Sequence, residues 1–108
     1  MKKKLDTGYL LDFYGPLLTE RQREALDMYY NMDYSLAEIA ADEGVTRQGV
    51  HRTILQGEKR LWELEAVLGH AALYAAAEKV LSAIETGEGI REASEKLRDC
   101  MERETDGI

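Results

Sequence analysis

The chain has 108 residues, of which 21 are acidic and 14 are basic, so its net charge is −7. Such a charge argues against a protein that coats nucleic acid regardless of sequence. A single cysteine excludes an internal disulfide, and no apolar run approaches the ~20 residues that span a bilayer. Because the three lysines at the start precede no apolar stretch, we expect a cytoplasmic protein without a leader or membrane insertion.

One proline and many alanine, leucine and glutamate residues favour an all-α fold. Met1–Lys4 is predicted to fray. A first helix is expected over Leu5–Tyr14, ended by Gly15-Pro16, after which Leu17 and Leu18 should pack under the next helix.

The second predicted helix begins at Thr19, where Thr19 and Gln22 have the spacing of a capping box. It should end near Asn31. Its inward face is predicted to consist of Ala25, Leu26, Tyr29 and Tyr30.

Ser35–Leu61 has the pattern of two helices joined by a tight turn. Ser35 and Glu38 form a second capping box, and Gly44 ends the short helix because glycine enters the left-handed conformation readily. Thr46 then caps a long helix. This arrangement predicts a helix-turn-helix motif.

The long helix has no stop signal before Gly69, and its inward positions alternate spacings of four and three like a coiled-coil seam. These positions are Val50, Ile54, Gly57, Leu61, Leu64 and Leu68. Trp62, beside the seam, is a candidate packing anchor. The seam needs a cover, either from the C-terminal helices or from a second chain, and its length favours a homodimer.

Two further helices, 70–85 and 90–104, are predicted to form a hairpin around the turn Gly87-Glu88-Gly89, with Thr105–Ile108 disordered. The apolar face of the first should contain Leu73, Ala77, Val80, Leu81 and Ile84. The predicted domains are a helix-turn-helix domain over 1–68 and a helical extension over 69–108.

The outward residues at the start of the long helix are the candidate nucleic-acid-binding set, because a helix-turn-helix presents this part of its second helix to a groove. Arginine and glutamine pair with base edges, and a helix N-terminus can meet a phosphate. Residues 44–60 contain four basic and one acidic residue, a net charge of +3. The set is Thr46, Arg47, Gln48, Gly49, His51 and Arg52.

No spacing of residues predicts a metal site, a cofactor or catalysis. His51 and His70 lie 19 positions apart, and Cys100 falls on an apolar helix face. Gly87-Glu88-Gly89 lacks the lysine of a phosphate loop. The chain is therefore expected not to be an enzyme.

The segment Leu17–Leu64 resembles the fourth region of bacterial sigma factors, which reads promoter DNA in the major groove. A closer resemblance is to the YlxM family of small bacterial proteins similar to that region. The matching residues are Asp12-Phe13-Tyr14, Leu17-Leu18-Thr19, Gln22, Tyr29-Tyr30, Asp33, Ser35-Leu36-Ala37-Glu38-Ile39-Ala40 and Val45-Thr46-Arg47-Gln48-Gly49-Val50.

The resemblance implies a three- or four-helix core of the sigma region 4 and winged-helix-repressor type, with a helical C-terminal extension. It also implies a link to the signal recognition particle pathway, through the particle's RNA or its GTPase. Where the family often has Tyr-Asp-Asn-Ile, this chain has His51-Arg52-Thr53-Ile54, which adds an outward arginine.

We therefore expect a non-enzymatic, regulatory or accessory helix-turn-helix protein that binds DNA, or the RNA or GTPase of the signal recognition particle. The alternative is a protein-interaction module that keeps the fold without binding nucleic acid. The two readings differ in whether Arg47 and Arg52 point outward together, which favours binding, or pair with neighbouring aspartate or glutamate residues.

Overall fold

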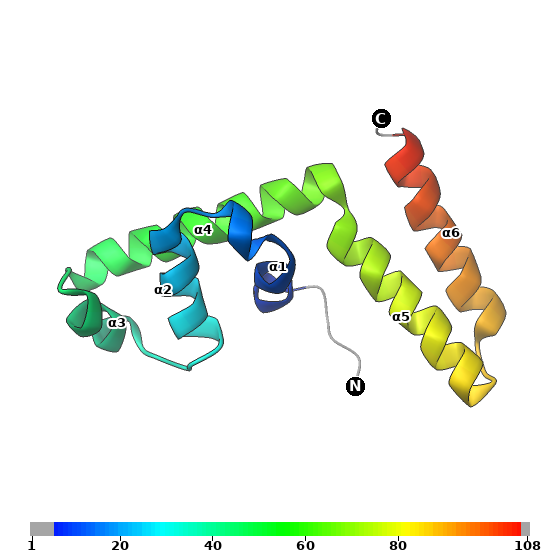
Figure 1. Cartoon of the computed structure of the whole chain (residues 1–108), viewed down its shortest axis with the longest axis horizontal. Coiled ribbons are helices and arrows are strands. Elements are labelled where there is room, and N and C mark those ends of the chain that lie inside the picture. Colours follow the sequence, from blue (N-terminus) through cyan, green and yellow to red (C-terminus); the bar gives the residue numbers. More distant parts are fainter. Residues whose placement is uncertain (1–5, 107–108) are drawn as a thin grey trace. The chain divides into compact units, whose positions relative to one another are not determined.

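The structure is a computed structural model and describes residues 6–106, with side chains as far as Glu102. All regular elements of the described chain are helices and none is a strand, which confirms the all-α prediction. Figure 1 shows its elements in chain order. They are α1 (Thr7–Tyr14), η1 (Gly15–Leu17, a 3-10 helix), α2 (Glu20–Tyr30), α3 (Leu36–Glu43), α4 (Arg47–Leu68), α5 (His70–Thr86) and α6 (Ile90–Asp106).

The described chain divides into two compact units. The N-terminal unit is Asp6–Leu64, and the C-terminal unit begins at Glu65. Helix α4 runs through the division. The domain boundary between residues 68 and 69 stays a prediction.

In the N-terminal unit, α2 crosses α4 at Gly57, which explains a glycine within a long helix. A Cβ atom at Gly57 would lie 2.7 Å from Cδ1 of Leu26 and 3.4 Å from Cβ of Gln22. The absent side chain therefore lets the two helices approach closely. The helix propensity lost at this glycine, about 1 kcal/mol relative to alanine, is the cost of that approach.

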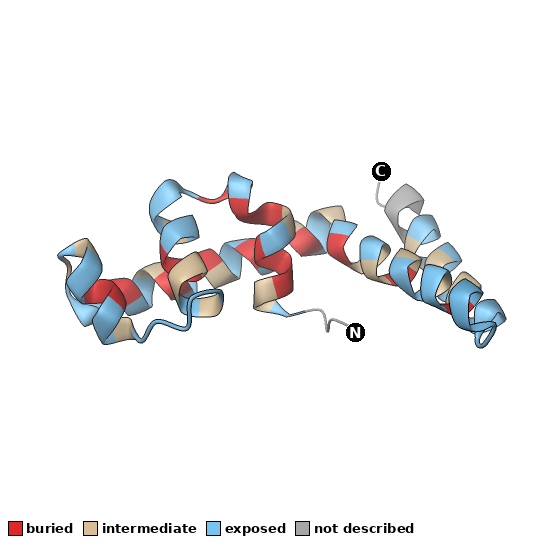
Figure 2. Ribbon diagram, turned by 60° about the horizontal axis from the view of Figure 1, so that its bottom comes forward, coloured by how far each residue is buried: buried red, intermediate tan, exposed pale blue. Residues whose placement is uncertain are grey.

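The core of the N-terminal unit draws residues from all four α-helices, and Figure 2 shows their buried faces. Leu61 is 0% exposed in a single copy. The prediction that the seam stays open for a second chain is therefore wrong at this residue. The largest fully buried side chains are Leu10, Leu26, Ile39 and Leu61.

Two residues that were expected inside lie at the surface. Leu17 is 57% exposed because the 3-10 turn of Gly15–Leu17 buries Leu18 in its place. Tyr29 is 40% exposed and contacts the ring of Tyr30 edge-on, with centroids 5.1 Å apart. The helical period places Tyr29 on the same side as Ala25 and Leu26, but Tyr29 lies in the last turn of α2, beyond the buried part of that side.

Both predicted capping boxes are confirmed. The amide of Gln22 donates to Oγ1 of Thr19 at 3.2 Å, and the amide of Glu38 donates to Oγ of Ser35 at 3.1 Å. The amide of Ser35 in turn donates to Oε1 of Glu38 at 3.1 Å. That backbone hydrogen bond, with the one from the Ser35 side chain, lowers the pKa of Glu38.

Ser35→Ala is expected to lower the free energy of unfolding by about 1 kcal/mol, because it removes the acceptor for an amide at the start of α3. The measurement is the thermal midpoint by circular dichroism. Ser35→Asp keeps an acceptor at this position and is expected to leave the midpoint nearly unchanged. Equal midpoints for Ser35→Ala and the unaltered protein would contradict the cap.

In the C-terminal unit, α5 and α6 form the predicted hairpin, side by side and antiparallel (Figure 1). The buried residues of α5 are small, namely Ala71, Ala76 and Ala83. Leu81 and Ile84 were predicted on the packed face, but they are 61% and 60% exposed. Helix α6 also continues to Asp106, so the prediction of disorder is wrong for Thr105 and Asp106.

The corner between α4 and α5 is held by a buried carboxylate. The amides of Ala71 and Ala72 donate to the two carboxylate oxygens of Glu65, at 3.0 and 3.1 Å. Gly69 has φ +63°, a left-handed conformation that turns the chain between the two helices. Glu65 thus caps a helix whose own N-cap residue has no side chain.

Among the described residues, no single helix is long and apolar enough to cross a membrane. The consecutive helices α4 and α5 meet the criterion of length and composition only when they are taken together.

Candidate nucleic-acid interface

The helix-turn-helix consists of α3, a tight turn and the first half of α4. Gly44 ends α3 in the left-handed conformation, with φ +68°, as the sequence predicted. The amide of Val45 donates to the carbonyl of Ala40 at 3.1 Å. Val45 is half-buried in the corner. The turn therefore fixes where α4 begins.

The first turn of α4 is organised by Thr46. The amide of Gly49 donates to Oγ1 of Thr46 at 3.0 Å, which confirms Thr46 as the cap. A Cβ atom at Gly49 would lie 3.1 Å from that same oxygen, and the carbonyl of Gly49 accepts from the hydroxyl of Thr53 at 3.0 Å. The polar groups of Gly49 are thus engaged within the helix.

The remaining candidates lie on the surface around the start of α4. Val50 and Ile54 turn into the core and are 2% and 3% exposed. With about 100° of rotation per residue, the positions of Gln48, His51 and Arg52 share the side away from this core. Thr46, Arg47, Gln48, His51 and Arg52 are all exposed, and Gly49 is half-buried.

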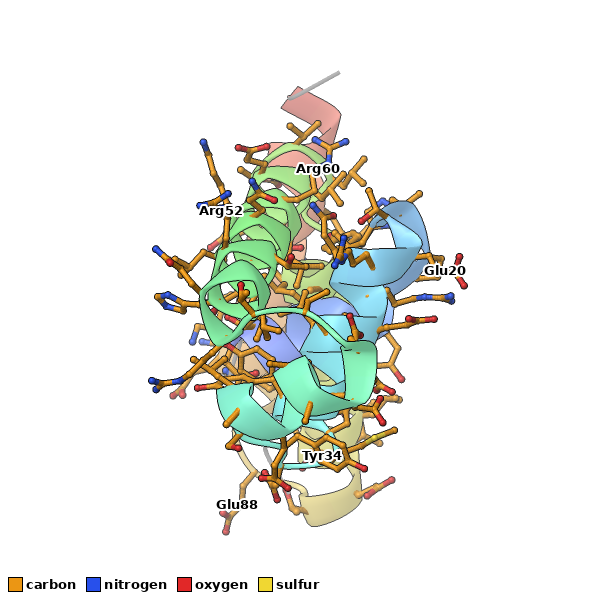
Figure 3. All side chains as sticks on the ribbon, turned by 90° about the vertical axis from the view of Figure 1, so that its left-hand side faces the viewer. Glu20, Tyr34, Arg52, Arg60 and Glu88 are labelled. Atoms are coloured by element: carbon orange, nitrogen blue, oxygen red, sulfur yellow. The ribbon has the colours of Figure 1, made fainter. Side chains whose placement is uncertain are left out.

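Figure 3 looks onto this end of the N-terminal unit, and Arg52 projects from α4 on the side away from α2, where Glu20 lies. Among the side chains that the structure describes, neither Arg47 nor Arg52 forms an ion pair with a carboxylate. Both arginines are thus exposed without a described ion pair, although five helical positions place them about 140° apart around α4.

The exposed face of α4 continues beyond the predicted set. Leu55 and Trp62 are 52% and 42% exposed, and Lys59 is exposed between them. Trp62 is therefore not the packing anchor that its place beside the seam suggested. Sequence reasoning missed Leu55 and Lys59. Leu55 lies three residues after Arg52, and Lys59 lies four residues after Leu55, which was the signal that the three share a helix face.

The one carboxylate within the basic stretch 44–60 is Glu58, and it is engaged elsewhere. The hydroxyl of Tyr30 donates to Oε2 of Glu58 at 2.6 Å. Burial and this hydrogen bond raise the pKa of Tyr30 to about 12. At neutral pH the phenol therefore keeps its proton and holds the carboxylate on the inner side of α4, where α2 passes.

Among the described residues, no group of three or more histidine, cysteine, aspartate or glutamate side chains could hold a metal ion. Cys100 lies in the hairpin, where its sulfur is 4.0 Å from the carbonyl of Ala72.

The sequence matches, over residues 1–101, the family described as "UPF0122: Putative helix-turn-helix protein, YlxM / p13 like". A UPF0122 protein of Desulforamulus reducens is 35% identical over 98% of this chain and 99% of its own length. One of Halalkalibacterium halodurans is 36% identical over 94% of each chain. One of Symbiobacterium thermophilum is 53% identical over 67% of each chain.

The matched segment includes the whole N-terminal unit, with its capped turn and exposed start of α4, and most of the hairpin. A helix-turn-helix family suggests a DNA-binding regulatory role rather than catalysis. The chain belongs to the UPF0122 family of YlxM-like helix-turn-helix proteins.

Proposed function

We propose that this protein is a regulatory protein that binds nucleic acid through the exposed start of α4. The observation that carries the proposal is the exposure of Arg47 and Arg52, without carboxylate partners among the described side chains, on the second helix of a helix-turn-helix. In an acidic chain, a local cluster of unpaired cations at a helix start is a surface suited to a polyanion.

In the proposed complex, the first turns of α4 enter the major groove of DNA. Arg52 and Gln48 contact base edges, since the guanidinium pairs with guanine and the amide with adenine. Thr46 and the helix start hold a phosphate, because the helix dipole favours an anion there. His51 lies beside these two positions on the same exposed side of α4. Gly49 lacks a side chain, so the groove wall can approach the first turn.

The net charge of −7 makes this binding depend on the local patch. Physiological salt screens charges beyond about 8 Å, so the acidic remainder acts weakly on a ligand seated at α4. We therefore expect modest affinity for random sequences and a larger affinity for a matching site.

The choice between DNA and the signal recognition particle is a separate proposal that rests on the sequence resemblance. Capture of bound nucleic acid from cells, followed by sequencing, distinguishes the ligands. Recovery of promoter fragments supports a transcriptional regulator, and recovery of the particle's RNA supports a role in protein targeting. Recovery of nothing above a mock capture favours the interaction module.

The arginine pair provides the test on the purified protein. Arg47→Ala plus Arg52→Ala is expected to weaken binding by about 1–3 kcal/mol for each lost base contact, and to reduce the salt slope for each lost phosphate contact. Lys79→Ala plus Lys96→Ala is the matched control, because it removes the same charge from exposed positions of α5 and α6. The measurement is a fluorescence anisotropy titration at two salt concentrations. Equal losses in the two double variants would contradict the proposal.

A further inference from the structure

Helix α5 has an apolar stripe that is more than half exposed at its large side chains. Tyr74, Leu81 and Ile84 are 54%, 61% and 60% exposed. With half-buried Ala77 they follow a spacing of three, four and three, so they lie on one side of the helix. Figure 2 shows how much of the hairpin surface is exposed.

Helix α6 has a matching stripe. Ile90 and Met101 are 45% and 54% exposed, and half-buried Ser94 and Leu97 lie between them at spacings of four, three and four. Each stripe follows the row that packs in the hairpin by one residue, or about 100° around the helix. Ala77 and Ile84 follow Ala76 and Ala83 on α5, and Ser94 and Met101 follow Ala93 and Cys100 on α6. Because α5 and α6 are antiparallel, this equal rotation places both stripes on one side. We call Tyr74, Leu81, Ile84, Ile90 and Met101 the hairpin face.

We propose that the hairpin face binds a second copy of this chain, so that two hairpins pair into a four-helix interface. At roughly 100 Å² for each of its five half-exposed large side chains, the face offers about 500 Å² per copy. Two copies would then bury about 1,000 Å², the area that a specific protein interface must reach. The dimer differs from the one that the α4 seam suggested, because Leu61 is already buried within one chain.

The charges at the edges of the hairpin face favour a second copy over a partner of a single sign. Glu78 and Glu85 flank the stripe on α5, whereas Arg91 and Arg98 lie next to the stripe on α6, with Glu95 and Glu102 further round. When α5 of one copy lies over α6 of the other, glutamates on one margin meet arginines on the other. A two-fold axis produces this match twice.

The test is the mass of the full-length protein by light scattering across a concentration series, without nucleic acid. A single chain has a mass of 12.2 kDa, and we expect twice that mass. Leu81→Glu plus Ile84→Glu is expected to give the single-chain mass. Leu17→Glu plus Met32→Glu is the matched control, because it alters two equally exposed apolar residues of the N-terminal unit and should leave the dimer intact.

Circular dichroism identifies a variant that fails to fold. In that case Leu81→Ala plus Ile84→Ala replaces it, with an expected rise of about tenfold or more in the dissociation constant of the dimer. A single-chain mass for the unaltered protein at its highest soluble concentration would overturn the proposal, since the face is then covered otherwise or left open. A dimer mass that persists in both Leu81 and Ile84 double variants would also overturn it. The same holds if the control, Leu17→Glu plus Met32→Glu, abolishes the dimer.

Discussion

Leu61→Ala is expected to lower the free energy of unfolding by about 2–5 kcal/mol, because it deletes a leucine side chain from a fully buried position. Leu61 is 0% exposed and lies one turn beyond Gly57, where α2 crosses α4. The loss combines the transfer free energy of the removed methyl groups with the cost of the cavity left behind. Chemical denaturation followed by circular dichroism measures it.

Leu55→Ala is the matched control for this substitution. It makes the same change on the same helix, but Leu55 is 52% exposed, so the expected loss is a small fraction of that at Leu61. Similar losses at the two leucines would contradict the burial of Leu61 within one chain. Leu61→Glu should unfold the N-terminal unit, because a carboxylate there would be buried without a partner.

Gly57→Leu is expected to destabilise the N-terminal unit strongly, even though leucine is the better helix former. The gain in helix propensity is below about 1 kcal/mol, whereas overpacking a core costs about 1–3 kcal/mol or more. Even a Cβ atom at Gly57 would lie 2.7 Å from a methyl group of Leu26, which is itself fully buried and has nowhere to move. The cost of overpacking therefore exceeds the gain in helix propensity, and the substitution lowers the free energy of unfolding.

Gln56→Leu controls for the added leucine, since Gln56 is exposed on the same helix one residue earlier. It should leave the thermal midpoint unchanged or slightly raised, while Gly57→Leu lowers it by many degrees. Gly57→Ala is expected to fall between the two. A midpoint for Gly57→Leu at or above that of the unaltered protein would show that α2 does not cross α4 at this glycine.

The sequence predicts the N-terminal unit well where structure depends on residues close in the chain. The boxes at Thr19 and Ser35, the stop at Gly44 and the cap at Thr46 each involve residues within a few positions of one another. The start of α4, and with it the exposed site residues, follows from this local chemistry. Gly57 was placed on the inward face, but only the crossing of α2 explains why it is glycine.

The hairpin was harder to predict because α5 has two apolar rows. One contains Ala76 and Ala83, and the other contains Leu81 and Ile84. Hydrophobic periodicity gives more weight to the larger side chains, so it selects the second row. Close helix packing selects the row of alanines instead, because small residues let the backbones of α5 and α6 approach. Periodicity alone cannot decide which row faces the partner helix.

The residues of the candidate site at the start of α4 were predicted individually, but the length of the exposed face that continues from them was not. Periodicity places Leu55, Lys59 and Trp62 along the same helix face as Arg52, whereas only the structure shows that this face is exposed. The capping of α5 by Glu65 was also beyond prediction, because a carboxylate one turn before a helix break looks like any other solvated glutamate.

The caps of the N-terminal unit have a consequence for how the chain folds. Asp6, Thr19, Ser35 and Thr46 each accept a hydrogen bond from the amide three residues later. Each such bond closes one of the shortest loops that a chain can form, at little cost in conformational entropy. The starting points of α1 to α4 are thus specified by contacts close in the chain, and such local contacts lower the contact order, which favours rapid folding.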